Sequence, residues 1–132
     1  MPETEKITIN LGPVDLGQID LLVEQGLYSN RSDFIRSAIR SKLDRHESVI
    51  QETARSWSLV LGAEHITNRW LEERREQGKK VAIRVIGALS FAKDVDPDLA
   101  RSVIDSITVF GTLRVSPALR EALADRITKR PT

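Results

Sequence analysis

The sequence predicts a mixed α/β chain in two parts: one strand with two helices, then a small α/β domain of strand–helix repeats. Apolar and polar residues alternate strictly over Lys6–Leu11, which is the pattern of a strand with two different faces. Apolar residues at helical spacing follow, and a motif Ile-x-Val-apolar-Gly-x-Leu then occurs twice. We therefore divide the chain into residues 1–46, a helical extension over 47–56, and residues 57–132.

Composition excludes several classes of protein. The chain has 132 residues, of which 40% are hydrophobic and 30% charged, so it is long enough to bury a core as one domain or two small ones. It contains no cysteine, which excludes disulfides and thiolate ligands. No apolar run approaches the roughly 18 residues of a membrane span, and the polar, acidic start is unlike a signal peptide. We expect a cytoplasmic protein without a membrane partner.

The alternating strand has no partner nearby in the sequence. Its apolar face carries Ile7, Ile9 and Leu11, and a lone strand does not persist in water. The two segments that follow are helical by pattern, so the missing strand is expected to come from a second copy of the chain. The sequence thus predicts a homodimer in which two such strands pair antiparallel over a core built from four helices.

Two helices are predicted after the strand. The first spans about residues 14–25, with Asp15 as N-cap, Gln18 at N3, and a hydrophobic staple between Val14 and Ile19.

The second helix opens at Ser29 or Asn30, and the pattern does not choose between these two caps. Its apolar stripe begins at Phe34 and continues to about residue 55.

The polar face of the strand suits DNA. A two-stranded ribbon fits the major groove, where Lys, Thr and Asn side chains can bond to base edges. The strand, the following Pro13, the turn Gly26–Ser29 and the run Arg31–Arg40 together resemble the ribbon-helix-helix repressors of the MetJ/Arc/CopG type. The resemblance covers about residues 5–46.

This resemblance implies a function and its residues. It assigns base reading to Lys6, Thr8 and Asn10, and phosphate binding to the turn into the second helix, at Ser29, Asn30 and Arg31. A helix N-terminus offers free N–H groups and a partial positive charge to such a phosphate. The expected protein is a transcriptional repressor that binds double-stranded DNA as a homodimer, on inverted-repeat operators.

The balance of charged residues in the first part of the chain does little to favour DNA binding. Residues 1–46 carry six basic and seven acidic side chains: Lys6, Arg31, Arg36, Arg40, Lys42 and Arg45 against Glu3, Glu5, Asp15, Asp20, Glu24, Asp33 and Asp44. Phosphate binding must therefore rely on Lys6, Arg31 and backbone N–H groups, and its salt dependence is expected to be modest.

The second half contains an internal repeat. Ile83–Leu89 and Ile107–Leu113 share the motif, and a weaker copy, Ser58–Gly62, precedes them. We expect each copy to be a short strand that ends at its glycine, followed by a helix with its own cap: Thr67 for a helix through Gln77, Asp96 for one to about Asp105, and Ser116 for one through Thr128. Parallel strands follow, either in a short solenoid-like stack or in a compact sheet.

No catalytic, metal or cofactor site is predicted. The two histidines, His46 and His65, lie far apart, and no nucleophile or phosphate-loop motif occurs. Trp57 and Trp70 are interpreted as core anchors in preference to a ligand pocket. The chain is therefore not expected to be an enzyme.

Two alternatives remain open. An antitoxin of the same fold would repress its own promoter and bind a toxin with its C-terminal part, although such a part is usually a short tail that orders on binding. An assembly protein would use the strand only to dimerise, without DNA. The second half is expected to add oligomerisation beyond the dimer, effector sensing or binding of a protein partner.

Overall fold

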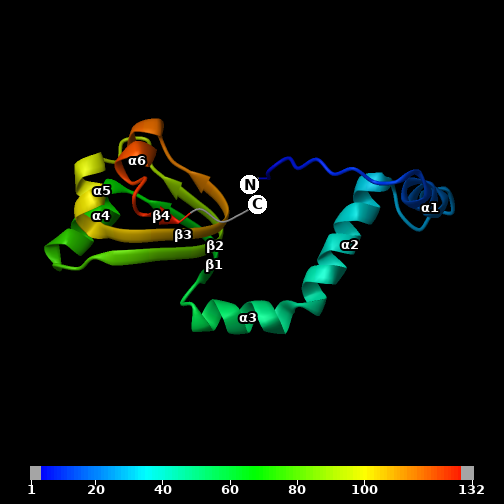
Figure 1. Ribbon diagram of the computed structural model, residues 1–132, viewed down its shortest axis with the longest axis horizontal. Coiled ribbons are helices and arrows are strands. Elements are labelled where there is room, and N and C mark those ends of the chain that lie inside the picture. Colours follow the sequence, from blue (N-terminus) through cyan, green and yellow to red (C-terminus); the bar gives the residue numbers. More distant parts are fainter. Residues whose placement is uncertain (1–3, 129–132) are drawn as a thin grey trace. The chain divides into compact units, whose positions relative to one another are not determined.

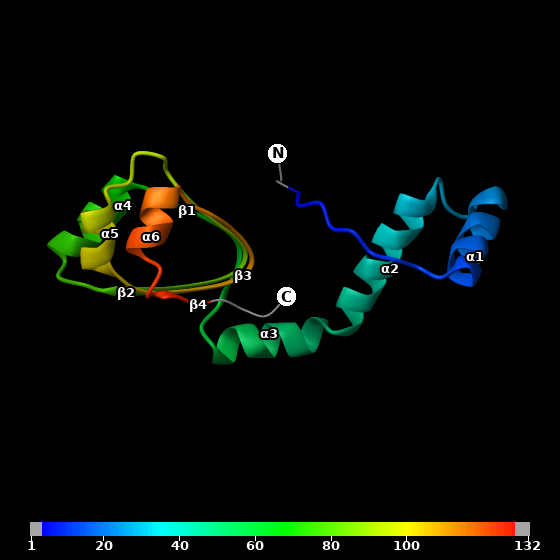
Figure 2. The ribbon, with the colours of Figure 1, turned by 45° about the horizontal axis from the view of Figure 1, so that its top comes forward.

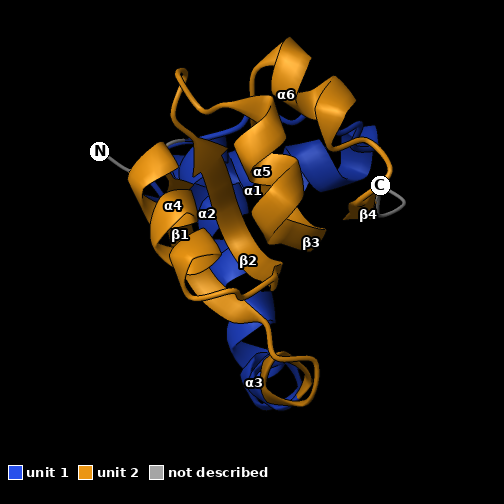
Figure 3. Cartoon of the chain, turned by 90° about the vertical axis from the view of Figure 1, so that its left-hand side faces the viewer, with its two compact units in different colours: residues 1–52 blue, residues 53–132 orange. Residues whose placement is uncertain are grey.

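The computed structural model describes residues 4–128, which fall into two compact units within Met1–Glu52 and Thr53–Thr132 (Figures 1 and 3). The predicted domains also include residues 1–3 and 129–132, which lie outside the described part. The described chain holds six helices and a four-stranded parallel sheet, so the predicted mixed α/β class is confirmed. Each unit is considered by itself below.

The first unit is helical. Its helices are α1 (Pro13–Glu24) and α2 (Arg31–Arg45), and α3 (Glu47–Ser56) leads out of it. Residues 4–12 form neither helix nor strand in the single chain. The predicted strand over Lys6–Leu11 requires a second chain for its hydrogen bonds, so its formation stays a prediction.

The helix starts correct two details of the sequence interpretation. Helix α1 begins at Pro13 with Gly12 as N-cap, so the predicted Asp15 cap is wrong. Proline at the first helical position is already fixed at a helical φ, which starts the helix before Asp15 can cap it. Val14 consequently lies inside the helix, and the predicted staple between Val14 and Ile19 is also wrong.

The second helix start is decided in favour of Asn30. Its side-chain oxygen accepts a hydrogen bond from the Asp33 N–H at 2.8 Å. The predicted continuous helix to about residue 55 is interrupted at His46, where φ is −101°, and α3 then begins at Glu47.

The second unit is a solenoid-like coil in which parallel strands alternate with helices. Its elements in chain order are β1 (Val60–Ile66), α4 (Asn68–Glu76), β2 (Val81–Phe91), α5 (Pro97–Val103), β3 (Ile104–Arg114), α6 (Pro117–Ala122) and β4 (Ile127–Thr128). The strands lie in sequence order in the sheet and all run parallel. Figure 2 shows the long strands bending sharply while the helices close each turn. Of the two predicted arrangements, the solenoid-like stack is the one observed.

The repeated glycines mark the bend. Gly62, Gly87 and Gly111 are direct neighbours across three strands, with φ of 140°, 137° and 124°. A Cβ built on Gly87 would lie 2.0 Å from the carbonyl oxygen of Gly62, and one on Gly111 would lie 2.1 Å from that of Gly87. The prediction that each strand ends at its glycine is wrong, because β1, β2 and β3 continue beyond it. Glycine lets the strand turn there without leaving the sheet.

The predicted caps of this unit are confirmed, but two helices are shorter than expected. Thr67, Asp96 and Ser116 each accept a backbone N–H at a helix start. Helix α5 ends at Val103 instead of about Asp105, since β3 begins immediately at Ile104. Helix α6 ends at Ala122 instead of Thr128, since Ile127 and Thr128 pair with β3. Sheet pairing takes up the backbone groups that longer helices would have used.

The coil encloses the main core. The buried hydrophobic residues of this cluster are Ile66, Leu71, Ile83, Val85, Leu89, Phe91, Val95, Leu99, Ala100, Val103, Ile104, Ile107, Leu119 and Leu123. Trp70 packs against the cluster, as predicted for a core anchor, whereas Trp57 is half exposed beside Phe110. The repeated Ile and Val of the motif point inward and fill successive turns of the coil.

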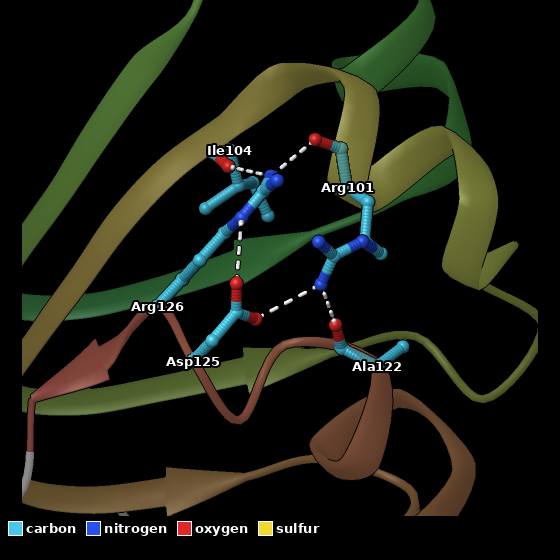
Figure 4. Close-up of polar contacts among 5 residues, drawn as sticks. All are labelled: Arg101, Ile104, Ala122, Asp125 and Arg126. Atoms are coloured by element: carbon cyan, nitrogen blue, oxygen red, sulfur yellow. Dashed lines mark hydrogen bonds and ion pairs between the residues drawn. The ribbon is translucent and has the colours of Figure 1, made fainter.

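Two arginines fasten the last turn (Figure 4). Arg126 donates to the carbonyl oxygens of Arg101 and Ile104, the latter at 2.6 Å. Arg101 in turn donates to the carbonyl oxygen of Ala122 and to the Asp125 carboxylate, at 2.9 Å for the carboxylate. Hydrogen bonding to Arg101 lowers the pKa of Asp125. Cationic donors thus bond to the carbonyl groups that the ends of α5 and α6 leave without helical partners.

Candidate nucleic-acid interface

The predicted base-reading residues lie on the segment before α1. Lys6, Thr8 and Asn10 are all exposed. The apolar residues between them are exposed as well, by 74% for Ile7 and 56% for Ile9. The apolar face of this segment, which its alternating pattern predicts to be buried in a core, is therefore still exposed in the single chain.

An apolar groove lies beside this segment. It measures about 390 Å³ and is bordered by Ile9 and Leu11 of the segment and by side chains of both helices, among them Leu22, Phe34 and Ile39. In the described part of the first unit, Ile19 is the one buried residue. This unit therefore leaves the side chains that would form its hydrophobic core half-buried or exposed.

The start of α2 is the predicted phosphate site. The Ser29 N–H donates to the Asp33 carboxylate at 2.9 Å, and Asn30 accepts from the Asp33 N–H. The next two N–H groups, of Arg31 and Ser32, occupy the first helical positions, which have no acceptor within the helix. A negatively charged ligand at this helix start would use these two groups.

Arg31 has a second role that the sequence did not reveal. Its Nε and Nη2 atoms donate to the two carboxylate oxygens of Asp20 at 2.8 and 2.9 Å, which ties α2 to α1. Hydrogen bonding to Arg31, assisted by its charge, lowers the pKa of Asp20, and the same bond raises the pKa of Arg31. The two residues lie 11 positions apart in different helices, so no local spacing rule could find the pair.

A comparison with known proteins identifies the family. Residues 2–120 match the model of the ribbon-helix-helix transcriptional regulator family. The chain belongs to this family. The predicted recognition is thereby confirmed, and the match extends well beyond the residues on which the resemblance was based.

One curated relative supports the same assignment. Transcriptional regulator CdrS of Halobacterium salinarum is 34% identical over 56 residues, which are 42% of this chain and 98% of the relative. More than half of this chain therefore has no counterpart in that relative. No solved structure matches the chain.

Membership of this family makes the chain a DNA-binding transcriptional regulator. Residues 4–128 contain no group of three or more His, Cys, Asp or Glu side chains placed to hold a metal ion. The acidic run at Asp94–Asp98 leads into α5, and Asn68 bonds to the backbone of its Asp94 and Asp96. No helix between residues 4 and 128 has the length and hydrophobicity to span a membrane.

Proposed function

We propose that this regulator acts as a homodimeric repressor that reads inverted-repeat operators with an antiparallel ribbon made from the Lys6–Leu11 segments of two chains. The ribbon enters the major groove, which admits a two-stranded β-ribbon and displays a distinct donor and acceptor pattern for each base pair. A two-fold dimer favours a two-fold operator, because each half of the protein then meets the same bases.

The exposed apolar face of the first unit carries the proposal. Ile7, Ile9 and Leu11 project from a segment without secondary structure, next to the apolar groove between that segment and the two helices. When two chains pair their segments, these residues cover both sets of helices and leave water together. Burying apolar surface contributes about 25 cal/mol per Å², so folding of this unit and dimerisation become one process.

The opposite face of the ribbon reads the bases. Pairing the two segments places Lys6, Thr8 and Asn10 of both chains on one surface, because side chains alternate along a strand. Lysine donates to guanine, asparagine forms two bonds with adenine, and threonine bonds to a base or touches a thymine methyl group.

The start of α2 positions the dimer on the backbone. The N–H groups of Arg31 and Ser32 bind a phosphate oxygen, and the Asn30 cap holds the helix start in shape. Arg31 contributes through the charge of a guanidinium that Asp20 already orients. Ser29 forms the turn that precedes these groups. Such contacts fix register and carry no sequence information of their own.

The test is binding to the promoter region of the protein's own gene. We expect Thr8→Ala and Asn10→Ala to leave the dimer folded and to cost about 1–3 kcal/mol of discrimination between operator and random DNA. Thr112→Ala, in the second unit, is the matched control and should bind as the wild type does. Operator affinity is measured by fluorescence anisotropy over a series of salt concentrations.

The outcomes separate the candidate functions. If Thr8→Ala and Asn10→Ala bind the operator as tightly as the wild type, the assigned reading face is wrong. If the wild type shows no salt-sensitive preference for its operator, the repressor proposal fails and an assembly role gains support. Purification of the chain with a small basic protein would favour the antitoxin, although the folded second unit differs from a tail that orders on binding.

A further inference from the structure

The two ends of the coil formed by the second unit differ in how their core is covered. A stack of repeats exposes the interior of its first and last turns, so natural stacks need a cap at each end. At the β4 end, α6 places Leu119 and Leu123 into the core, and the two arginines bond to the neighbouring carbonyl groups. Side chains therefore cover the core at this end, where β4 pairs with Ile107 and Thr108 of β3.

The β1 end is open. Strand β1 is the edge of the sheet, and all but its last residue are exposed, including Val60 at 49% and Leu61 at 64%. A hollow of about 290 Å³ enters the coil at this end, lined by Val60, Glu64 and Ile66 of β1, by Trp70 and Arg74 of α4, and by the start of β2. This edge strand of seven residues contains neither proline nor lysine and one acidic residue, Glu64, so few features oppose pairing with another strand.

Gly62, Gly87 and Gly111 form a column across the sheet, and this column indicates that β1 lacks a neighbouring strand at its outer edge. In the inner turns, the position where a Cβ of Gly87 or Gly111 would stand is filled by the carbonyl group of the previous turn's glycine. The corresponding position at Gly62 is empty, although Gly62 has the same backbone conformation. A further strand at this edge would continue the column.

We infer that the open end is capped by the same end of a second copy of this chain, with β1 pairing antiparallel to β1 about a two-fold axis at Gly62. The bend fixes the register, because two bent strands follow each other only when their bends coincide. Gly62 then lies opposite Gly62, Leu61 opposite Ala63, and Val60 opposite Glu64. The large Leu61 thus meets the small Ala63, and Glu64 faces Val60 instead of its own copy.

The helix beside the edge fits the same arrangement. Helix α4 carries three basic and three acidic residues, Arg69, Arg74 and Arg75 with Glu72, Glu73 and Glu76. The two-fold axis makes the two α4 helices run antiparallel at the contact, and the equal numbers of basic and acidic residues on α4 avoid a contact surface of one charge sign. The contact uses the same surface on both copies and closes on itself, so association stops at two coils.

Continuity within the chain favours a second copy over a foreign partner. Only Trp57, Ser58 and Leu59 separate α3 from β1, so any dimer formed by the first unit carries two open ends on short tethers. Tethering raises the effective concentration of one end near the other. This step rests on the proposed dimer, whereas the shape of the edge does not.

Crosslinking tests the contact, since the full chain has no cysteine of its own. In the inferred register, the two Ala63 Cα atoms lie about 8 Å apart, from a strand spacing of about 4.8 Å and a rise of about 3.4 Å per residue. We expect Ala63→Cys to give a covalent dimer with a short bismaleimide in the absence of DNA. Thr112→Cys, in the same row but on β3, lies about 24 Å from its copy by the same spacing and should give none.

Hydrogen exchange of the full chain provides a second readout. We expect the amides of residues 60–66 to be protected as strongly as those of β2. The double variant Leu61→Lys with Ala63→Lys places like charges opposite each other and should lose this protection, whereas Thr112→Lys should keep it. If Ala63→Cys crosslinks no better than Thr112→Cys, the contact is refuted, whether or not the chain binds its operator. Failure of operator binding with efficient Ala63→Cys crosslinking would refute the repressor and leave the contact standing.

Discussion

The two units bury their apolar residues in opposite ways. The second unit closes 14 buried hydrophobic residues inside one chain, whereas the described part of the first unit buries Ile19 and exposes Ile7, Leu21, Leu27 and Leu43. Both units contain regular apolar patterns, so the pattern alone does not tell whether a core is completed within a chain. A unit of about 50 residues lies near the lower limit for folding alone, and a second copy is the simplest way to complete it.

The largest expected effect distinguishes these two ways of forming a core. Ile9→Lys places a charge in the core that the proposed dimer shares, and we expect the first unit to lose its folded state. The second unit should be unaffected, since none of its core residues comes from the segment before α1. Both tryptophans lie in the second unit, so their fluorescence reports on it, while hydrogen exchange over residues 13–45 reports on α1 and α2.

Thr8→Lys is the matched control for that variant. It adds the same charge to the neighbouring position on the polar face and should leave exchange over residues 13–45 unchanged. If Ile9→Lys also leaves that exchange unchanged, Ile9 does not belong to a shared core and the proposed ribbon is wrong.

Two glycines are expected to respond in opposite ways to substitution by alanine. Gly87→Ala forces a Cβ against a carbonyl oxygen at a φ of 137°, and we expect a loss of about 3 kcal/mol or more in the stability of the coil. Gly17→Ala lies in helix α1 with no atom within 4 Å of the added Cβ, and alanine in a helix gains about 1 kcal/mol over glycine. Urea unfolding measured by tryptophan fluorescence, for Gly87→Ala, and by circular dichroism, for Gly17→Ala, tests the opposite signs. Equal effects would show that the bend does not require glycine.

Much of the second unit could be predicted from the sequence because its signals are local. The caps at Thr67, Asp96 and Ser116 each require only a side chain and an N–H two or three residues later, and all three are present. The motif repeat translated directly into strand register, with Ile83 opposite Ile107.

The details that failed depend on contacts distant in the sequence. The end of α5 is decided by the pairing of β3 with β2, and the mid-strand position of Gly87 by the carbonyl group of a strand 25 residues earlier. The pairing of Arg31 with Asp20 requires two helices to be placed against each other first. In the first unit, the base-reading assignment of Lys6, Thr8 and Asn10 came from the resemblance, and it stays a prediction because a second chain and DNA are needed to test it.

The smallest expected effect concerns the ion pair between Asp20 and Arg31, which joins α1 to α2 within a single chain. Hydrogen bonding to Arg31 lowers the pKa of Asp20, so the pair stabilises the α1–α2 contact above the ordinary carboxyl pKa of about 4. This contribution disappears as the pH falls through the lowered pKa, where Asp20 takes up a proton. Asp20→Asn should therefore speed hydrogen exchange in α1 and α2 at pH 7 and match the wild type under strongly acidic conditions. Glu24→Gln, which makes the same change in charge at the end of α1, should not reproduce this pH dependence. A difference between Asp20→Asn and wild type that stays constant with pH would mean that packing around residue 20, and not the ion pair, joins the two helices.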